Sequence, residues 1–169
     1  MDGIGNASNR VNTKCPRIFE VNIYLETSLH GPAVRSGTGE WIVEYIKTSG
    51  KPEVRRGMVN RDKTTENALT LFLLWEALGI LTRTCQVRIY TSCPHILNTM
   101  QNNWLAQWER NGWINAKGKP VKNADLWKKC MELGRNHYIE VDNRYHSRMT
   151  EMQEDIRKEM EKPYEKHYA

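Results

Sequence analysis

The sequence has no long apolar run and nothing that resembles a secretory signal. Its longest apolar run, Leu71 to Trp75, is ended by Glu76, whereas a membrane-spanning helix needs roughly 18 to 20 apolar residues. Segment 1–17 contains no apolar core of the kind that a signal peptide requires. These absences predict a soluble protein of the cytoplasm with no membrane partner.

Cysteine is scarce, and the spacing of the cysteines does not indicate metal binding. Cys15, Cys85, Cys93 and Cys130 lie far apart and form no C-x-x-C pair, which argues against a zinc knuckle and against a disulfide framework. Internal repeats and low-complexity tracts are absent as well. We therefore expect reduced thiols in a single globular domain.

Aromatic and charged residues are plentiful. The 169 residues are 39% hydrophobic and 27% charged, with six Trp and seven Tyr, which is enough burial-prone surface for one folded domain. The formal net charge of +5 permits a polyanionic partner. Most of this excess lies between Trp104 and Cys130, where Arg110, Lys117, Lys119, Lys122, Lys128 and Lys129 stand against Glu109 and Asp125.

Hydrophobic periodicity divides the chain into strands and helices. Alternation predicts a strand from Phe19 to Leu25, and the stretch from Ser28 to Gly39 has the composition of a turn. Later strands are predicted over 41–46, 54–59, 87–91 and 138–141, and helices over 65–81, from Pro94, from Trp104, over 123–133 and over 150–161. The predicted organisation is a disordered lead-in over 1–17, a domain over 18–161 and a frayed tail over 162–169.

Several blocks of the sequence resemble one family. WLAQWERNGW at 104–113 and GKPVKNADLW at 118–127 are similar to the basic protrusion and following helix of bacterial type 1 ribonuclease H. TTEN at 64–67, CQVRIYT at 85–91 and IYLETS at 23–28 match further family segments. The resemblance covers roughly residues 19 to 160. It implies an α/β, ribonuclease H-like fold: a mixed five-stranded sheet, three antiparallel strands then parallel ones, flanked by helices, with a basic protrusion.

The resemblance also locates the catalytic positions, and two of these have lost their charge. In the family, four carboxylates bind two magnesium ions that drive hydrolysis of the RNA strand of an RNA/DNA hybrid. The corresponding residues here are Glu26, Thr70, Ser92 and Glu154, and a shifted register would place Asn67 at the second position. The resemblance therefore implies a divergent member with a degenerate site. It holds either no metal or a weakly bound Mg²⁺ or Mn²⁺ at Glu26 and Glu154.

Three further residues are possible substitutes. Glu66 precedes Thr70 by one helical turn, so it could rebuild a site with Glu26 and either Glu154 or Asp155; the simpler interpretation is a first-turn Glu favoured by the helix dipole. His146 matches a family loop histidine that could assist proton transfer or product release. With the metals lost, we expect a solvated loop histidine instead.

The residues that the resemblance assigns to nucleic-acid binding are better preserved than those assigned to the metal site. By resemblance, Thr65 and Asn123 hold a phosphate of the DNA strand and Asn67 contacts the minor groove, although Ala68 and Pro94 replace two further contact residues of the family. The protrusion contributes Trp104, Trp108 and Trp113, which can also pack against their own helix, and three phosphate-binding candidates, Lys117, Lys119 and Lys122.

Three functions follow from these observations. The leading one is a ribonuclease H-like module that binds RNA/DNA hybrid or duplex through a site that is no longer catalytic. The alternative is an active hybrid ribonuclease with a rearranged carboxylate site. The third is a protein–protein assembly module that no longer contacts nucleic acid.

Overall fold

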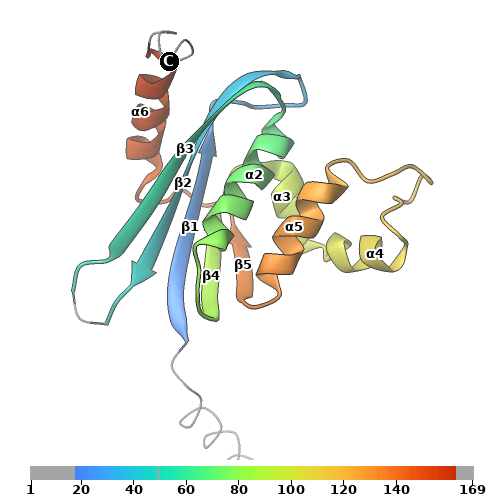
Figure 1. Ribbon diagram of the computed structural model, residues 1–169, viewed down its shortest axis with the longest axis horizontal. Coiled ribbons are helices and arrows are strands. Elements are labelled where there is room, and N and C mark those ends of the chain that lie inside the picture. Colours follow the sequence, from blue (N-terminus) through green and yellow to red (C-terminus); the bar gives the residue numbers. More distant parts are fainter. Residues whose placement is uncertain (1–17, 49, 163–169) are drawn as a thin grey trace, which may run out of the picture.

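The computed structural model describes residues 18–48 and 50–162, which form one sheet with helices on both faces (Figure 1). The predicted lead-in over 1–17 and most of the predicted tail lie outside these residues. The elements in chain order are β1 Phe19–Thr27, β2 Arg35–Ile46, β3 Glu53–Thr64, α2 Glu66–Gly79, β4 Cys85–Tyr90, α3 Pro94–Gln101, α4 Trp104–Arg110, α5 Ala124–Gly134, β5 Tyr138–Asp142 and α6 Met149–Met160.

The sheet has five strands in the order β3-β2-β1-β4-β5. β1, β2 and β3 pair antiparallel, whereas β4 pairs parallel to β1 and β5 pairs parallel to β4. A parallel neighbour needs a crossover connection, and α2 supplies it between β3 and β4. The mixed sheet expected from the sequence is confirmed.

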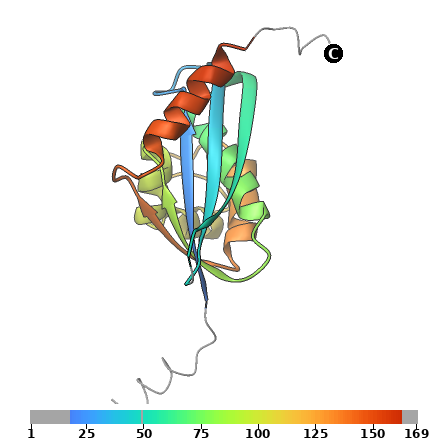
Figure 2. The same ribbon diagram turned by 90° about the vertical axis from the view of Figure 1, so that its left-hand side faces the viewer.

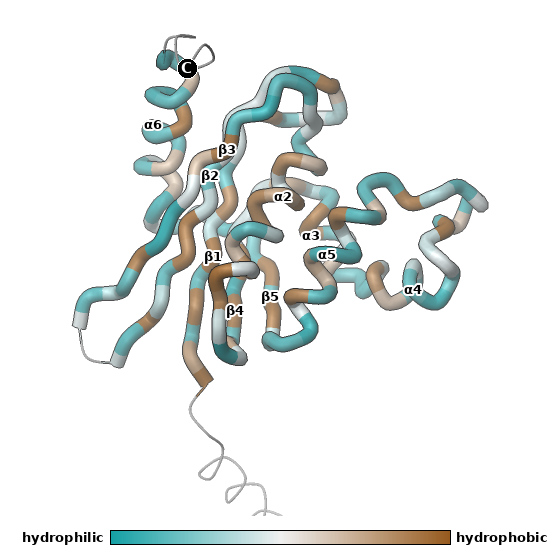
Figure 3. The backbone as a smooth tube through the Cα atoms, viewed as in Figure 1, coloured by the Kyte–Doolittle hydropathy of each residue, from teal (hydrophilic) through white to brown (hydrophobic). Residues whose placement is uncertain are grey.

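The two faces of the sheet are covered unequally. α2 packs on one face with α5 beside it, and α6 lies across the other face (Figure 2). The main core lies under α2, whose sequence is the most continuously hydrophobic of the helices (Figure 3). The core on the α6 side is small: its buried residues are Tyr24, Ile42 and Met152. Polar contacts must therefore contribute more to holding α6 than to holding α2.

Two helix starts follow directly from local sequence. The hydroxyl of Thr65 accepts a hydrogen bond from the Ala68 N–H at 3.1 Å and so caps α2. Pro94 occupies the first turn of α3, where its missing N–H leaves no hydrogen bond unmade. No helix among the described residues is long and apolar enough to cross a membrane.

The stretch from Ser28 to Gly39 is not all turn, because β2 begins at Arg35. A Cβ atom added to Gly37 would lie 2.6 Å from Cδ1 of Leu29, and one added to Gly39 would lie 2.7 Å from Cδ1 of Leu73. These glycines therefore allow the β1–β2 loop and α2 to pack closely on the strand. The turn predicted over Ser28 to Gly39 is therefore wrong from Arg35 onward. In this part the glycines allow close packing and do not reverse the chain.

Candidate functional site

Glu26 lies near the end of β1 and is already hydrogen-bonded by the protein. Its Oε2 is 3.0 Å from Nε2 of His146, and the side chains are 8% and 3% exposed respectively. Nδ1 of His146 accepts from the Arg148 N–H at 3.2 Å, so the proton belongs on Nε2, which donates to Glu26. The carboxylate is thus bound by a ring nitrogen.

His146 is a buried residue, and its prediction as a solvated loop histidine is wrong. Its ring lies against Tyr24, with centroids 4.6 Å apart, and near Tyr90 at 5.7 Å. Both tyrosines lie on the α6 face of the sheet. The preceding residue, Tyr145, is 71% exposed, whereas the side chain of His146 turns inward onto β1. The local sequence carries no signal for this difference.

The two hydroxyl residues at family carboxylate positions lie in different surroundings. Thr70 is buried and donates to the carbonyl oxygen of Glu66 at 2.7 Å, one turn back in α2. Ser92 is exposed in the short connection between β4 and α3. Neither side chain supplies a negative charge, and hard divalent cations require anionic or strongly polar oxygen ligands.

The fourth family position, Glu154, and the two possible substitute carboxylates, Glu66 and Asp155, are engaged elsewhere. Oε1 of Glu66 accepts from the Gly31 N–H at 3.0 Å and fastens the β1–β2 loop to α2. Glu154 is exposed and bonded to Arg157 on its own helix, whose contact lowers the pKa of this carboxyl. Asp155 bonds Arg56 of β3 at 3.1 Å. The structure thus gives each of these carboxylates a different protein partner.

The residues present do not fit the two metal ions of the family site. Over 18–48 and 50–162, no group of three or more His, Cys, Asp or Glu side chains could hold a metal ion. The donor set contains two hydroxyls, and one oxygen of its buried carboxylate is bonded to His146.

Sequence reasoning missed the buried carboxyl of Glu40 in β2. Glu40 pairs directly with Glu26 across β1 and β2 and is 2% exposed. Burial, reinforced by a hydrogen bond to Asp155, raises the pKa of Glu40 to about 8. In the sequence, the only signal is a charged residue between Gly39 and Trp41, inside a strand. In the structure both of these neighbours are buried.

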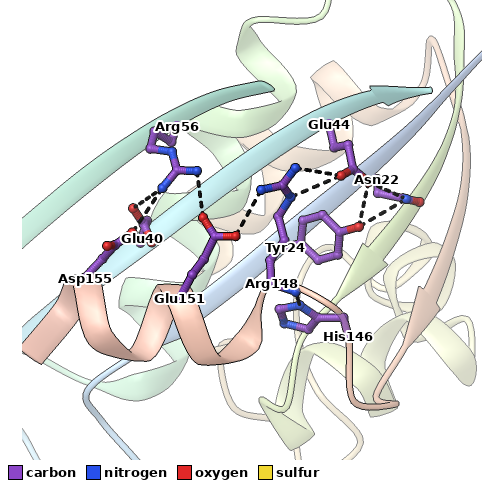
Figure 4. A network of polar contacts seen from close by, with 9 residues as sticks. All are labelled: Asn22, Tyr24, Glu40, Glu44, Arg56, His146, Arg148, Glu151 and Asp155. Carbon is purple, nitrogen blue, oxygen red and sulfur yellow. Dashed lines mark hydrogen bonds and ion pairs between the residues drawn. The ribbon is translucent and has the colours of Figure 1, made fainter. Parts of the chain in front are cut away.

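A network of polar contacts joins this face of the sheet to α6 (Figure 4). Arg56 bonds Asp155 at 3.1 Å and Glu151 at 2.9 Å. Arg148 bonds Glu44 at 2.9 Å. Burial by itself would raise the pKa of Glu44, but hydrogen bonds from Asn22, Tyr24 and Arg148 outweigh it and lower that pKa. Ion pairs thus hold α6 to this face of the sheet.

The predicted nucleic-acid residues lie on the other side of the molecule and in the protrusion. Thr65 is at the start of α2, and Asn123 precedes α5 with a left-handed φ of 60°. Asn67 accepts a hydrogen bond from the buried thiol of Cys93 at 3.3 Å. Because α2 packs against α5, the two helix starts belong to one helical layer.

The tryptophans of the protrusion pack with one another. Trp108 lies 6.2 Å from Trp104, 6.3 Å from Trp113 and 6.3 Å from Trp127 between ring centroids. Packing, the second interpretation given for these tryptophans, therefore accounts for ring contacts of Trp104, Trp108 and Trp113. Lys128 also places its ammonium 5.3 Å from the Trp113 ring. The basic loop over 114–122 is thus connected to a packed cluster of tryptophan rings.

The loop itself is ordered by one asparagine. Oδ1 of Asn115 accepts from the N–H groups of Lys117 and Lys119 at 2.9 and 3.0 Å, and Ile114 bridges to Pro120. Gly118 takes a φ of 80° at the tip, a conformation that favours glycine. This turn leaves Lys117, Lys119 and Lys122 exposed.

Comparison with known proteins points to one family. Residues 20–147 match the family model described as RNase H. A protein named Ribonuclease H from Symbiobacterium thermophilum is 34% identical over 121 residues, covering 72% of this chain and 78% of the relative.

Solved structures share the fold. A structure described as LC9-RNase H1, a type 1 RNase H with the type 2 active-site motif, gives a TM-score of 0.67 at 22% identity, covering 86% of this chain and 72% of the other. A foamy viral protease-reverse transcriptase in complex with RNA/DNA hybrid gives 0.53 at 20% identity, covering 77% of this chain and 19% of the other.

Proposed function

The chain belongs to the RNase H family, and on that premise we propose that it binds RNA/DNA hybrid or duplex nucleic acid without cleaving it. The relatives are named Ribonuclease H, which makes nucleic acid the expected partner. The proposal is that binding has been kept and metal-dependent hydrolysis lost.

One observation carries the loss of hydrolysis: Glu26 is bonded to His146 while Thr70 and Ser92 stand at two of the other carboxylate positions. Two-metal hydrolysis depends on two cations held about 3.5 to 4 Å apart by anionic oxygens. A hydroxyl in place of a carboxylate removes the charge that offsets the mutual repulsion of the ions. Mg²⁺ or Mn²⁺ would bind weakly or not at all.

The retention of binding is supported by the protrusion and the helix starts. Exposed lysines on a turn ordered by Asn115 present ammonium groups to solvent, and phosphate contacts of this kind supply sequence-independent affinity. Thr65 and Asn123, at the starts of α2 and α5, are the proposed phosphate-positioning residues. A similar fold has been seen with RNA/DNA hybrid in a foamy viral enzyme.

The test is to incubate a labelled RNA/DNA hybrid with Mg²⁺ or Mn²⁺ beside a binding assay on the same substrate. We expect binding and no release of RNA fragments. Metal-dependent cleavage that Glu26→Gln abolishes would establish the active ribonuclease in place of this proposal. Absence of both cleavage and binding would favour the protein–protein module.

A further inference from the structure

Four side chains on α5, α2 and β3 form a row of cations and aromatic rings. The ammonium of Lys129 in α5 lies 5.4 Å from the ring centroid of Trp75 in α2, and the Trp75 and Phe72 rings are 5.6 Å apart between centroids. At the other end, the guanidinium carbon of Arg61 in β3 lies 4.3 Å from the Phe72 centroid. This cation–aromatic row therefore crosses the helical layer, where α2 contacts both α5 and β3 (Figure 1).

The row adjoins the basic protrusion at its α5 end. Lys128, the neighbour of Lys129 on α5, places its ammonium 5.3 Å from the Trp113 ring. Trp113 belongs to the tryptophan cluster of the protrusion and precedes the basic loop over 114–122. Positive charge thus continues from the loop lysines onto α5 and across α2 to β3.

Neither cation of the row has a carboxylate partner within the part of the chain that the structure describes. Arg61 is exposed and donates to the carbonyl oxygen of Asn60 at 3.1 Å. Asp125 and Glu132 lie about one turn before and after Lys129 on α5, and neither of these two described residues pairs with it. Both charges therefore remain available to an anion supplied from outside the chain.

The ring contacts prepare the two cations for binding. Phe72 and Trp75 are half-buried against the core, whereas Arg61 and Lys129 are exposed. A cation over an aromatic ring is attracted by the ring, so it has already lost part of the rotamer freedom that binding a phosphate would cost. Because packed helices lie about 8 to 10 Å apart, the row spans roughly 20 Å, which matches about six successive phosphates of one strand.

Resting on the proposed function, we propose that the cation–aromatic row is a second phosphate-contact surface, over which an RNA/DNA hybrid bound at the protrusion extends toward β3. The two unpaired cations select a polyanion, since each can neutralise a phosphate and release its condensed counterions. Continuity with the protrusion selects the same duplex as the occupant. Because these contacts are made to the backbone, they add affinity without adding base specificity.

Salt titration of hybrid binding on the full chain tests the proposal. A labelled RNA/DNA hybrid of about 20 base pairs, long enough to cover both the protrusion and the row, is titrated by fluorescence anisotropy at several salt concentrations, with EDTA present so that no metal-dependent cleavage interferes. Arg61→Gln/Lys129→Gln removes both charges but keeps hydrocarbon stems that can pack on the rings. We expect this variant to flatten the slope of log affinity against log salt concentration by roughly two.

Two further double variants separate the row from charge in general. Arg157→Gln/Lys158→Gln removes one arginine and one lysine from α6, on the other face of the sheet, and should keep the wild-type slope. Arg61→Lys/Lys129→Arg keeps both charges of the row and should also keep it. If Arg61→Gln/Lys129→Gln does not fold, each single Gln variant should flatten the slope by about one.

The outcomes distinguish this inference from the function on which it rests. A wild-type slope in Arg61→Gln/Lys129→Gln, with Lys119→Ala/Lys122→Ala still flattening the slope, would overturn the row as a phosphate surface and leave binding at the protrusion intact. An acidic protein would then become the candidate occupant of the row. A lower thermal stability with an unchanged slope would give the ring contacts a structural role alone, which also overturns the inference. Absence of hybrid binding by the wild type would remove the proposed function and the row together.

Discussion

His146 donates its Nε2–H to Oε2 of Glu26 over 3.0 Å, and both side chains are buried. The partners are 120 residues apart in the chain, so the contact fixes the loop before α6 against the end of β1. It also occupies a carboxylate that the resemblance aligns with a metal ligand of the family. Glu26 has therefore taken on a structural partner.

Returning two carboxylates to the site should restore cation binding. In Thr70→Glu/Ser92→Asp, the new carboxylates supply the charge that divalent cations require, at the positions that the resemblance aligns with the family's metal ligands. We expect Mg²⁺ or Mn²⁺ uptake by calorimetry, with stabilisation of about 2.7 kcal/mol at a metal concentration of 100 times Kd.

The matched control is Thr82→Glu/Thr84→Asp, which adds the same charge in an exposed loop and should bind no metal. Failure of the first variant, correctly folded, to take up either cation would contradict the alignment of Thr70 and Ser92 with the family carboxylates.

Removing two protrusion lysines should weaken binding to nucleic acids of different base sequence by a similar factor. Each lysine that neutralises a phosphate contributes about −0.9 to the slope of log affinity against log salt concentration on B-form DNA. Lys119→Ala/Lys122→Ala should therefore flatten the slope by roughly two. Binding titrations on hybrid and duplex DNA at several salt concentrations measure the effect.

Lys51→Ala/Lys158→Ala is the matched control, since both lysines are exposed on other parts of the molecule. Equal slopes for the two double variants and the wild type would remove the protrusion from the binding surface. Thermal stability should be nearly the same in all three proteins, because exposed lysines contribute little to it.

Arg148→Ala should destabilise the domain and reduce its sensitivity to acid. The variant leaves Glu44, 11% exposed, without its cation, which costs about 2 to 3 kcal/mol at neutral pH. In the wild type the pKa of Glu44 is lowered in the folded state. The associated stability is present above the unfolded pKa and is lost as pH falls through the folded value.

Urea unfolding between pH 3 and pH 7 measures both effects. The gap between variant and wild type should be largest near pH 7 and should narrow at the acid end. A gap of constant size across this range would mean that Arg148 acts through packing instead of charge.

Gly57→Ala should destabilise β3 by overpacking. A Cβ atom at this position would lie 2.5 Å from Nε1 of Trp41, and the same indole nitrogen donates to Glu76 of α2 at 3.0 Å. The ring cannot move without straining that hydrogen bond, so we expect a loss of about 1 to 3 kcal/mol.

Gly79→Ala offers a control, because its added Cβ would be 4.0 Å from the Leu133 side chain, an ordinary contact distance. Chemical denaturation of both variants gives the comparison. Equal stabilities would show that the Trp41 ring shifts freely.

Much of the fold could be read from local patterns. Alternating apolar residues predicted β1, the capping hydroxyl of Thr65 marked the start of α2, and Pro94 marked the start of α3. These signals act over a few residues, so composition and spacing are sufficient to detect them. The Thr and Ser at two carboxylate positions were equally evident from the family resemblance.

Only the tertiary structure decided which charges are buried and with whom they pair. Glu40 and Glu44 alternate with apolar residues as on a solvent-facing strand surface, yet α6 and its preceding loop cover that surface. The Glu26–His146 and Glu44–Arg148 contacts join residues more than 100 positions apart. The sequence by itself determines which ionisable groups exist and which strand face they share. Their protonation and partners depend on desolvation and on charges from other elements, and these act only once α6 has packed against the sheet.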